Sequence, residues 1–207
     1  MMIRISIAQL LRDENKLGEF ARCIANGGVA VVPTDTLYGF AVAADCPAAV
    51  DKIYAIKNRD SRKPLILFLE KFENLGETGI KTGSKQTEVL QKYWPGALTA
   101  VFPCPPHPSI SAFIFPTLGI RIPGHRLLLD LLQRLPCRLL TTSANRSGLP
   151  SDPDPEKIAG EFAGEIDWLI EDGILPTAQA STVVDLSSEP WRVLRQGSIN
   201  LDAYLSE

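Results

Sequence analysis

Residues 27–40 constrain the fold more than any other stretch of the sequence. Gly27 and Gly28 precede a short run of Val and Ala over 29–32, which Pro33 ends. An apolar, β-branched run bounded in this way is typical of a buried strand. A polar loop follows over 34–39, with two threonines, an aspartate, a tyrosine and a glycine. Ligands often bind where a polar loop leaves a strand of an α/β chain, although an ordinary turn is an equally good interpretation of this stretch alone.

A second stretch repeats the same order. Residues 138–142 predict another apolar strand, which ends in two threonines and opens into a loop over 143–148 that is rich in hydroxyl and amide groups and ends in Gly148. Two polar loops that each follow a strand can converge on one cleft. We therefore expect the loops after 32 and after 142 to share a site.

The length and composition limit the class of protein. At 207 residues, the sequence predicts a single domain over 1–207, and its net charge of −3 gives no global attraction to nucleic acid or membrane. The four cysteines are widely spaced, which is typical of reduced thiols in a cytoplasmic protein. No signal peptide and no apolar run of about 20 residues is present, so no membrane segment is expected.

The hydrophobic patterns alternate between helix and strand and predict an α/β fold. Ser84 and Ser198 are expected to cap helices, residues 70–83 to lie on the surface, and residues 103–108, with His107, to form an extended connection without a function. His125 precedes a predicted helix, and the sequence leaves open whether it caps, binds or does neither. Helices are expected over 15–25, 47–57, 84–93, 127–135 and around 158–162, and strands over 29–32, 65–69, 97–102, 118–123, 138–142 and 168–170, with a hairpin over 181–195.

Positively charged residues cluster in one loop and recur at strand ends. Four cations fall within 57–63, between a predicted helix and a predicted strand. Arg121 lies inside a short apolar strand, where its charge is costly unless an anion meets it.

The sequence has no P-loop, dinucleotide fingerprint, zinc motif or nucleophile elbow. Cations beside strand-end hydroxyls favour a polyphosphate and a small polar ligand, with catalysis by positioning and charge neutralisation.

Seven motifs in order carry a resemblance that runs from about Gly27 to Gly197. Together they closely resemble the YrdC/TsaC family of threonylcarbamoyl-AMP synthases, in the short form that ends soon after Arg195. The motifs are Pro33-Thr34-Asp35-Thr36-Leu37-Tyr38-Gly39, Lys57-Asn58-Arg59 leading to Pro64-Leu65, Trp94-Pro95-Gly96-Ala97-Leu98-Thr99, Gly119-Ile120-Arg121-Ile122-Pro123, Thr142-Ser143-Ala144-Asn145-Arg146-Ser147-Gly148, Ser181-Thr182-Val183-Val184-Asp185 and Leu194-Arg195-Gln196-Gly197.

The resemblance implies a fold and a reaction. The expected fold is a single α/β domain with a twisted, largely open mixed sheet, flanked by helices, and a basic concave cavity. The expected enzyme is a nucleotidyltransferase that joins L-threonine, bicarbonate or CO2, and ATP into threonylcarbamoyl-AMP and pyrophosphate. Mg²⁺ is expected to accompany ATP, with no protein metal site. The product would pass to a threonylcarbamoyl transferase, which forms N6-threonylcarbamoyladenosine on tRNA. The resemblance leaves open whether this chain also contacts tRNA.

The resemblance also implies roles for particular residues. Lys57 and Arg59 would act in catalysis by offsetting charge on the departing pyrophosphate. The other implied contacts divide between two ligands: Thr36, Arg121, Thr141 and Ser181 with L-threonine, and Arg59, Lys63, Thr117, Ser143, Asn145, Ser151 and Arg195 with ATP.

The sequence departs from the family pattern at three places, which keeps two alternatives open. Asn58 and Asp60 stand in the basic loop where members often have Gly and Pro, Phe68 stands where many members have His, and Asp152 follows Ser151 where Pro-Thr is more frequent. One alternative is a paralogue that acts on a different carbamoyl or acyl substrate. The other is an RNA-binding module, although its cations are few and are not interleaved with stacking aromatics.

Overall fold

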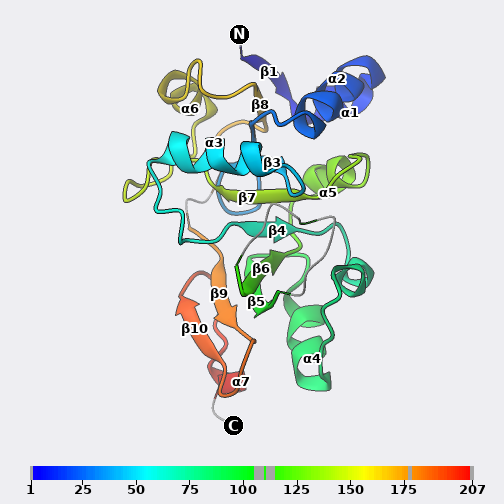
Figure 1. The fold of residues 1–207 in the computed structure, drawn as a ribbon, viewed down its shortest axis with the longest axis vertical. Helices are drawn as coiled ribbons and strands as arrows, with labels where there is room; N and C mark the ends of the chain where they lie inside the picture. The colour runs from blue at the N-terminus through cyan, green and yellow to red at the C-terminus, as the bar shows by residue number, and fades with distance from the viewer. Residues whose placement is uncertain (1, 105–109, 111–114, 177–178, 206–207) are drawn as a thin grey trace.

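A mixed β-sheet forms the frame of the molecule (Figure 1). The computed structural model describes residues 2–104, 110, 115–176 and 179–205, and within these ranges the sheet has ten strands in the order β1-β8-β2-β3-β7-β4-β6-β5-β9-β10. The strands are β1 (Ile3–Ser6), β2 (Ala30–Val32), β3 (Gly39–Ala43), β4 (Ile66–Phe68), β5 (Leu98–Pro103), β6 (Thr117–Arg121), β7 (Leu139–Ser143), β8 (Trp168–Glu171), β9 (Thr182–Asp185) and β10 (Arg192–Arg195).

Parallel and antiparallel pairs alternate irregularly across this sheet. β1 with β8, β2 with β8, β4 with β6, and β5 with β9 are parallel, and the remaining neighbours are antiparallel. Strand direction turns from β7 and β4, which cross the view of Figure 1, to β9 and β10, which run along it. The twisted, open, mixed sheet that the resemblance implies is therefore confirmed.

Helices flank the sheet on both faces. They are α1 (Ile7–Arg12), α2 (Glu14–Ala25), α3 (Pro47–Lys57), α4 (Ser84–Tyr93), α5 (Arg126–Leu132), α6 (Pro155–Glu161) and α7 (Asp202–Leu205), with a 3-10 helix η1 (Phe72–Thr78). Within the described ranges, none of these helices is long and apolar enough to cross a bilayer.

One face of the sheet is covered along most of its length. Because side chains alternate along a strand, Leu67 of β4, Leu118 and Ile120 of β6 and Leu140 of β7 point to the same side. Apolar residues of α3, α4 and α6 pack against them. The larger of the two hydrophobic cores therefore lies on this face of the sheet.

The other face is covered over only part of the sheet. Residues of α1, α2 and α5 pack there against β1, β8, β2, β3 and the edge of β7, with the Phe20 and Trp168 rings in edge-to-face contact at 5.4 Å. The described residues of this second core include none from β6, β5, β9 or β10. Beyond Phe68, this side of the sheet includes Thr99 of β5, and Thr117, Gly119 and Arg121 of β6.

Local sequence signals explain most helix boundaries. Pro47 is the first residue of α3, as predicted, where its missing N–H is not needed. His125 caps α5, since its Nδ1 accepts a hydrogen bond from the Leu128 backbone N–H at 3.2 Å. Ser6 and Gln9 form a capping box for α1, an element that was not predicted. The predicted hairpin is present as antiparallel β9 and β10.

Four expectations are wrong. Ser84 is the first residue of α4 rather than its cap, because Gly83 occupies that position and its N–H is accepted by the Gln86 side chain. Ser198 caps no helix, since α7 begins at Asp202. The region 70–83 is not simply surface, because Leu75 and Ile80 are buried. Gly39 begins strand β3 rather than ending a loop. His107 lies outside the described residues.

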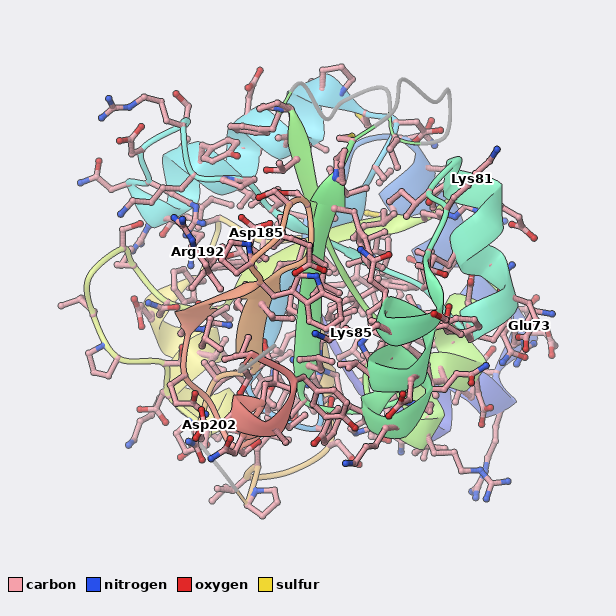
Figure 2. All side chains as sticks on the ribbon, turned by 90° about the horizontal axis from the view of Figure 1, so that it is seen from below. Glu73, Lys81, Lys85, Asp185, Arg192 and Asp202 are labelled. Atoms are coloured by element: carbon pink, nitrogen blue, oxygen red, sulfur yellow. The ribbon has the colours of Figure 1, made fainter. Side chains whose placement is uncertain are left out.

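Side-chain contacts fix the C-terminal hairpin against the rest of the sheet. Within the hairpin, Asp185 of β9 is the register partner of Arg192 of β10 (Figure 2). Outside it, the Lys85 ammonium of α4 lies 4.8 Å from the centre of the Trp191 ring, which directly precedes β10. Thr182 is fully buried, and its Oγ1 accepts from the backbone N–H groups of Gly197 and Ile199 and donates to the Ile199 carbonyl. This one hydroxyl therefore holds the segment that follows β10.

We predict that Thr182→Val destabilises the fold by about 2–4 kcal/mol, because it leaves the backbone N–H groups of buried Gly197 and partly buried Ile199 without an acceptor. Thr78→Val is the matched control: Thr78 is equally buried, but its hydroxyl donates only to the Leu75 carbonyl. Its loss should cost about 1 kcal/mol. Urea unfolding of both variants measures the difference, and equal losses would contradict the role given to Thr182.

Candidate active site

A cavity opens on the uncovered part of the sheet. The elements around it are β4, β6, β7, the loop between β2 and β3, and the start and end of the C-terminal hairpin. It is lined by Thr34, Thr36, Leu37, Tyr38, Gly39, Arg59, Pro64, Ile66, Phe68, Arg121, Thr141, Thr142, Ser143, Ala180, Ser181 and Arg195. The two polar loops expected to converge do so, because Gly39 of β3 pairs with Ser143 of β7.

Strand alternation decides which side chains reach this cavity. In β4, Leu67 points into the larger core while Ile66 and Phe68 point to the cavity side. In β6, Ile120 belongs to the core and Arg121 to the cavity. The family resemblance places Phe68 beside the threonine pocket, and the structure confirms that Phe68 lines the cavity. Ile66 was not predicted to line it, although the period of two in the sequence was a signal from which it could have been found.

The loop between β2 and β3 is organised by Thr34. Its Oγ1 accepts hydrogen bonds from the backbone N–H groups of Thr36 and Leu37, both at 3.0 Å, and donates to the Leu37 carbonyl at 2.6 Å. Threonine hydroxyls stabilise tight turns in this way. The turn directs the Thr36 hydroxyl toward Arg121.

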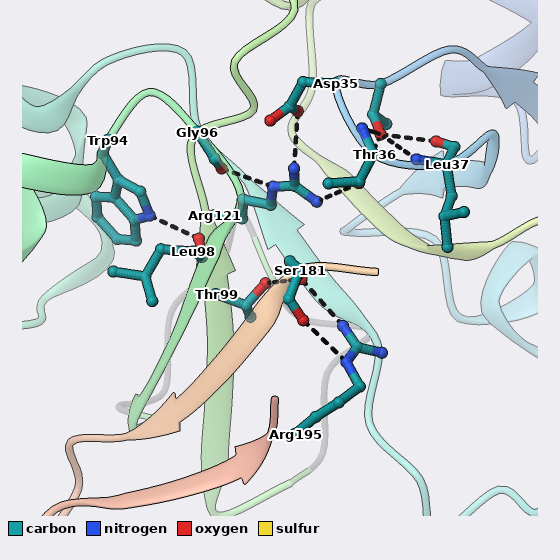
Figure 3. Close-up of polar contacts among 11 residues, drawn as sticks. Asp35, Thr36, Leu37, Trp94, Gly96, Leu98, Thr99, Arg121, Ser181 and Arg195 are labelled. Atoms are coloured by element: carbon teal, nitrogen blue, oxygen red, sulfur yellow. Dashed lines mark hydrogen bonds and ion pairs between the residues drawn. The ribbon is translucent and has the colours of Figure 1, made fainter. Parts of the chain in front are cut away.

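Arg121 is almost fully buried and is held by three partners (Figure 3). Its Nε donates to the Gly96 carbonyl at 2.9 Å, its Nη1 to Thr36 Oγ1 at 2.8 Å, and its Nη2 to Asp35 Oδ1 at 2.7 Å. Burial lowers the pKa of Arg121, and the Asp35 carboxylate opposes that shift. The sequence predicted that an anion must meet Arg121 but did not identify Asp35 as that anion.

Arg195 and Ser181 form a second polar group in the cavity (Figure 3). Arg195 donates through Nε to the Ser181 carbonyl and through Nη2 to Ser181 Oγ, both at 3.0 Å. Ser181 Oγ also lies 2.9 Å from Thr99 Oγ1, and both of these side chains are buried. Thr99 was not predicted to contribute to the site.

Two of the cavity arginines act electrostatically on the third, Arg195. Partial burial lowers the pKa of Arg195, and the positive charges of Arg121 and Arg59 lower it further. Arg59 donates to the backbone carbonyls of Lys63 and Pro64, and burial lowers its pKa as well. No carboxylate is among the described residues that line the cavity. The arrangement therefore favours an anionic ligand.

Comparison with known proteins identifies the family. The Sua5/YciO/YrdC family model, whose description reads "Telomere recombination", matches residues 22–197. The chain belongs to the Sua5/YciO/YrdC family.

Two curated relatives are named threonylcarbamoyl-AMP synthase. The protein from Bacillus subtilis is 31% identical over 92% of this chain and 56% of its own length, and the protein from Pyrococcus abyssi is 33% identical over 98% and 59%. Pyrococcus abyssi Sua5, solved in complex with L-threonine, has a TM-score of 0.82 at 30% identity over 98% of this chain and 58% of its own. The chain thus spans a little under 60% of these relatives' length.

A further solved structure is similar in fold. Escherichia coli YciO has a TM-score of 0.82 over 93% of this chain and 94% of its own, at 22% identity. At that identity the likeness supports the fold alone.

The family-implied site residues fall into two groups in the structure. Seven of them line the cavity, namely Thr36, Arg59, Arg121, Thr141, Ser143, Ser181 and Arg195. Five are not among the lining residues, namely Lys57, Lys63, Thr117, Asn145 and Ser151. The roles of all twelve residues in binding or catalysis stay predictions.

Lys57 lies behind the cavity wall rather than in it. Its ammonium is buried and donates to the carbonyls of Ser143 and Asn145, the latter at 2.7 Å. Asn145 Oδ1 in turn accepts from Ser151 Oγ at 3.1 Å. These three residues, which the family resemblance places near ATP, therefore form a hydrogen-bonded support for Ser143.

The remaining two residues lie farther from this support. Lys63 is exposed, and its backbone carbonyl accepts from Tyr54 and Arg59. Thr117 begins β6 and pairs with Pro103 of β5. Within the described ranges no group of three or more His, Cys, Asp or Glu residues is placed to hold a metal ion.

We predict that Lys57 makes stability depend on pH. Burial, reinforced by Arg59, lowers the pKa of its ammonium from 10.5 to about 7. Between about pH 7 and pH 10 the unfolded chain therefore binds more protons at this position than the folded one, and the free energy of unfolding rises with pH by at most about 1.4 kcal/mol per unit.

Lys57→Met should remove this contribution, whereas Lys52→Met should keep it, because Lys52 is exposed on the same helix. Urea unfolding at pH 7, 8 and 9 measures the slopes. Equal slopes for wild type and Lys57→Met would show that the buried amine does not titrate in this range.

Proposed function

We propose that this protein is a threonylcarbamoyl-AMP synthase. It would convert L-threonine, bicarbonate or CO2, and ATP with Mg²⁺ into threonylcarbamoyl-AMP and pyrophosphate, a nucleotidyl transfer. The observation that carries the proposal is the convergence of Arg59, Arg121 and Arg195 with strand-end hydroxyls in one cavity. The names of the curated relatives and the L-threonine complex of Pyrococcus abyssi Sua5 support it.

The cavity offers two chemically different corners for the two larger substrates. Arg121 stands beside the hydroxyls of Thr36 and Thr141 and the apolar wall of Ile66 and Phe68. A guanidinium, hydroxyl groups and an apolar surface together match the carboxylate, the polar groups and the methyl of threonine. We assign threonine to this corner.

The nucleotide would occupy the side formed by Arg59, Ser143 and Arg195. The guanidinium groups of Arg59 and Arg195 have no carboxylate partner among the described residues. They can therefore meet phosphate oxygens without first breaking an ion pair. Lys57 would act indirectly here, by holding the Ser143 and Asn145 carbonyls.

The proposed reaction follows from this placement. The neutral amine of threonine attacks CO2 and releases a proton, which gives a carbamate. A carbamate oxygen then attacks the α-phosphorus of ATP, and the bond from that phosphorus to the pyrophosphate oxygen breaks. The side chains supply orientation and neutralise the charge that develops on pyrophosphate. The product would be consumed by a transferase that modifies tRNA.

The direct test is pyrophosphate release from ATP and bicarbonate with Mg²⁺, measured with threonine, with serine and without an amino acid. We expect release with threonine that clearly exceeds both other conditions. Release that ignores the amino acid would point to a paralogue with another acceptor. Salt-sensitive RNA binding without any ATP consumption would contradict the enzyme and favour an RNA-binding module.

We predict that Arg59→Ala lowers kcat/KM for pyrophosphate release by about 100-fold or more, because a cavity cation that meets the leaving group is lost. Arg62→Ala is the matched control. Arg62 belongs to the same loop, but it is highly exposed and paired only with Asp60, so its loss should change the rate less than about twofold. Both variants should unfold like wild type. Wild-type rates in Arg59→Ala would exclude the role assigned to it.

A further inference from the structure

Asp35 lies against Arg121 but outside the cavity. Its Oδ1 accepts from Arg121 Nη2 at 2.7 Å, and its side chain is 19% exposed, against 5% for Arg121. Asp35 is not among the described residues that line the cavity, whereas Arg121 and the neighbouring Thr36 are. Asp35 instead borders a separate depression with Gly124 and His125. Figure 3 shows Asp35 on the side of Arg121 opposite to Ser181 and Arg195, two residues that line the cavity.

The three contacts of Arg121 determine what it can offer a ligand. A guanidinium has five N–H donors in one plane, and Gly96, Thr36 and Asp35 each accept one of them. Two N–H donors remain, one on Nη1 and one on Nη2, and both are available to the oxygens of a carboxylate. The three contacts come from two loops, so the plane of the guanidinium is fixed before any ligand enters.

Asp35 also changes the charge of this corner. Arg59 and Arg195 have no carboxylate partner among the described residues, so they favour a polyanion. Arg121 and Asp35 together carry no net charge. A triphosphate gains little electrostatic binding energy beside an ion pair that has no net charge. A zwitterionic amino acid, which has no net charge itself, loses little binding energy through this neutralisation and needs only the two remaining N–H donors of Arg121.

We propose that Asp35 is a positioning residue that fixes the Arg121 guanidinium for a single carboxylate and keeps polyphosphate out of the threonine corner. Threonine and the triphosphate of ATP would then bind at different ends of one positively charged cavity. This inference rests on the proposed function for the identity of the carboxylate ligand. The exclusion of polyphosphate can be tested without it.

The first test is Asp35→Asn, which removes the charge and keeps the shape. We expect the KM for threonine to rise about tenfold or more, since the guanidinium loses a charge-assisted contact, while the KM for ATP stays within about twofold. Inorganic triphosphate should compete only with ATP in the wild type, but with both ATP and threonine in the variant. Asp51→Asn, an exposed position on α3, is the matched loss of one charge and should match wild type.

The second test moves Asp35 without altering any charge. A Cβ at Gly124 would lie 2.9 Å from Asp35 Oδ2 and 3.2 Å from the Gly96 Cα. Gly124→Ala should therefore displace the flexible carboxylate. We expect a raised KM for threonine with triphosphate still competing against ATP alone. This variant tests the positioning role even if Asp35→Asn does not fold.

Calorimetric titration with inorganic triphosphate separates the proposed function from the proposal that Asp35 excludes polyphosphate. If wild type shows no threonine-dependent turnover, the proposed function fails. The charge argument still stands if Asp35→Asn binds triphosphate at an additional site or about tenfold more tightly than wild type and Asp51→Asn. Unchanged triphosphate binding in folded Asp35→Asn overturns the exclusion, and wild-type threonine KM values in both Asp35→Asn and Gly124→Ala overturn the positioning.

Discussion

The ion pair between Arg121 and Asp35 is the contact on which the arrangement of the site depends. A guanidinium on a central strand is stable only if its burial is offset by good hydrogen bonds and an opposite charge. Those partners come from the loop after β2 and the loop before β5, so both loops must be held in place. Thr34 holds the first through its turn, and Trp94, which donates to the Leu98 carbonyl at 2.8 Å, helps to hold the second.

A second buried cation, Lys57, holds another loop beside the cavity, the one that begins at Ser143. Lys57 ends α3, yet its ammonium points inward to the carbonyls of Ser143 and Asn145 and lies 5.4 Å from the Phe40 ring centre. Such a group organises a loop because it brings two carbonyls that leave β7 to a single ammonium. The cations of this fold therefore divide by task. Lys57 and Arg121 are held by backbone carbonyls, hydroxyls or a carboxylate of neighbouring loops, whereas Arg59 and Arg195 have no carboxylate partner among the described residues.

The sequence predicted the fold wherever a local signal was decisive. Pro47 marked the start of α3, and the alternating run around Ser187-Ser188-Glu189-Pro190 marked the hairpin. It failed where two local signals competed. Ser84 offered a hydroxyl cap, but Gly83 and Gln86 form the cap together, and the polar residues before Gly39 obscured the short strand β3. For the site as well, local sequence signals identified a residue but not its partner. The cost of burying Arg121 was evident, but its partner Asp35 is 86 residues away in the sequence, a pairing that only the tertiary structure determines.

The hydrogen bonds of Ser181 connect the two halves of the cavity. A hydroxyl has one donor and two acceptor positions. Arg195 uses one acceptor position of Ser181 Oγ, and the contact with Thr99 uses either the other acceptor position or the donor. If Thr99 donates, Ser181 keeps its donor for an oxygen of the ligand; if Thr99 accepts, only an acceptor position remains. The orientation of one buried threonine hydroxyl thus decides which kind of group Ser181 can bind beside Arg195. Because the same Ser181 oxygen accepts from Arg195 and lines the cavity, the hydrogen bonding of Thr99 and that of Arg195 are coupled through one atom.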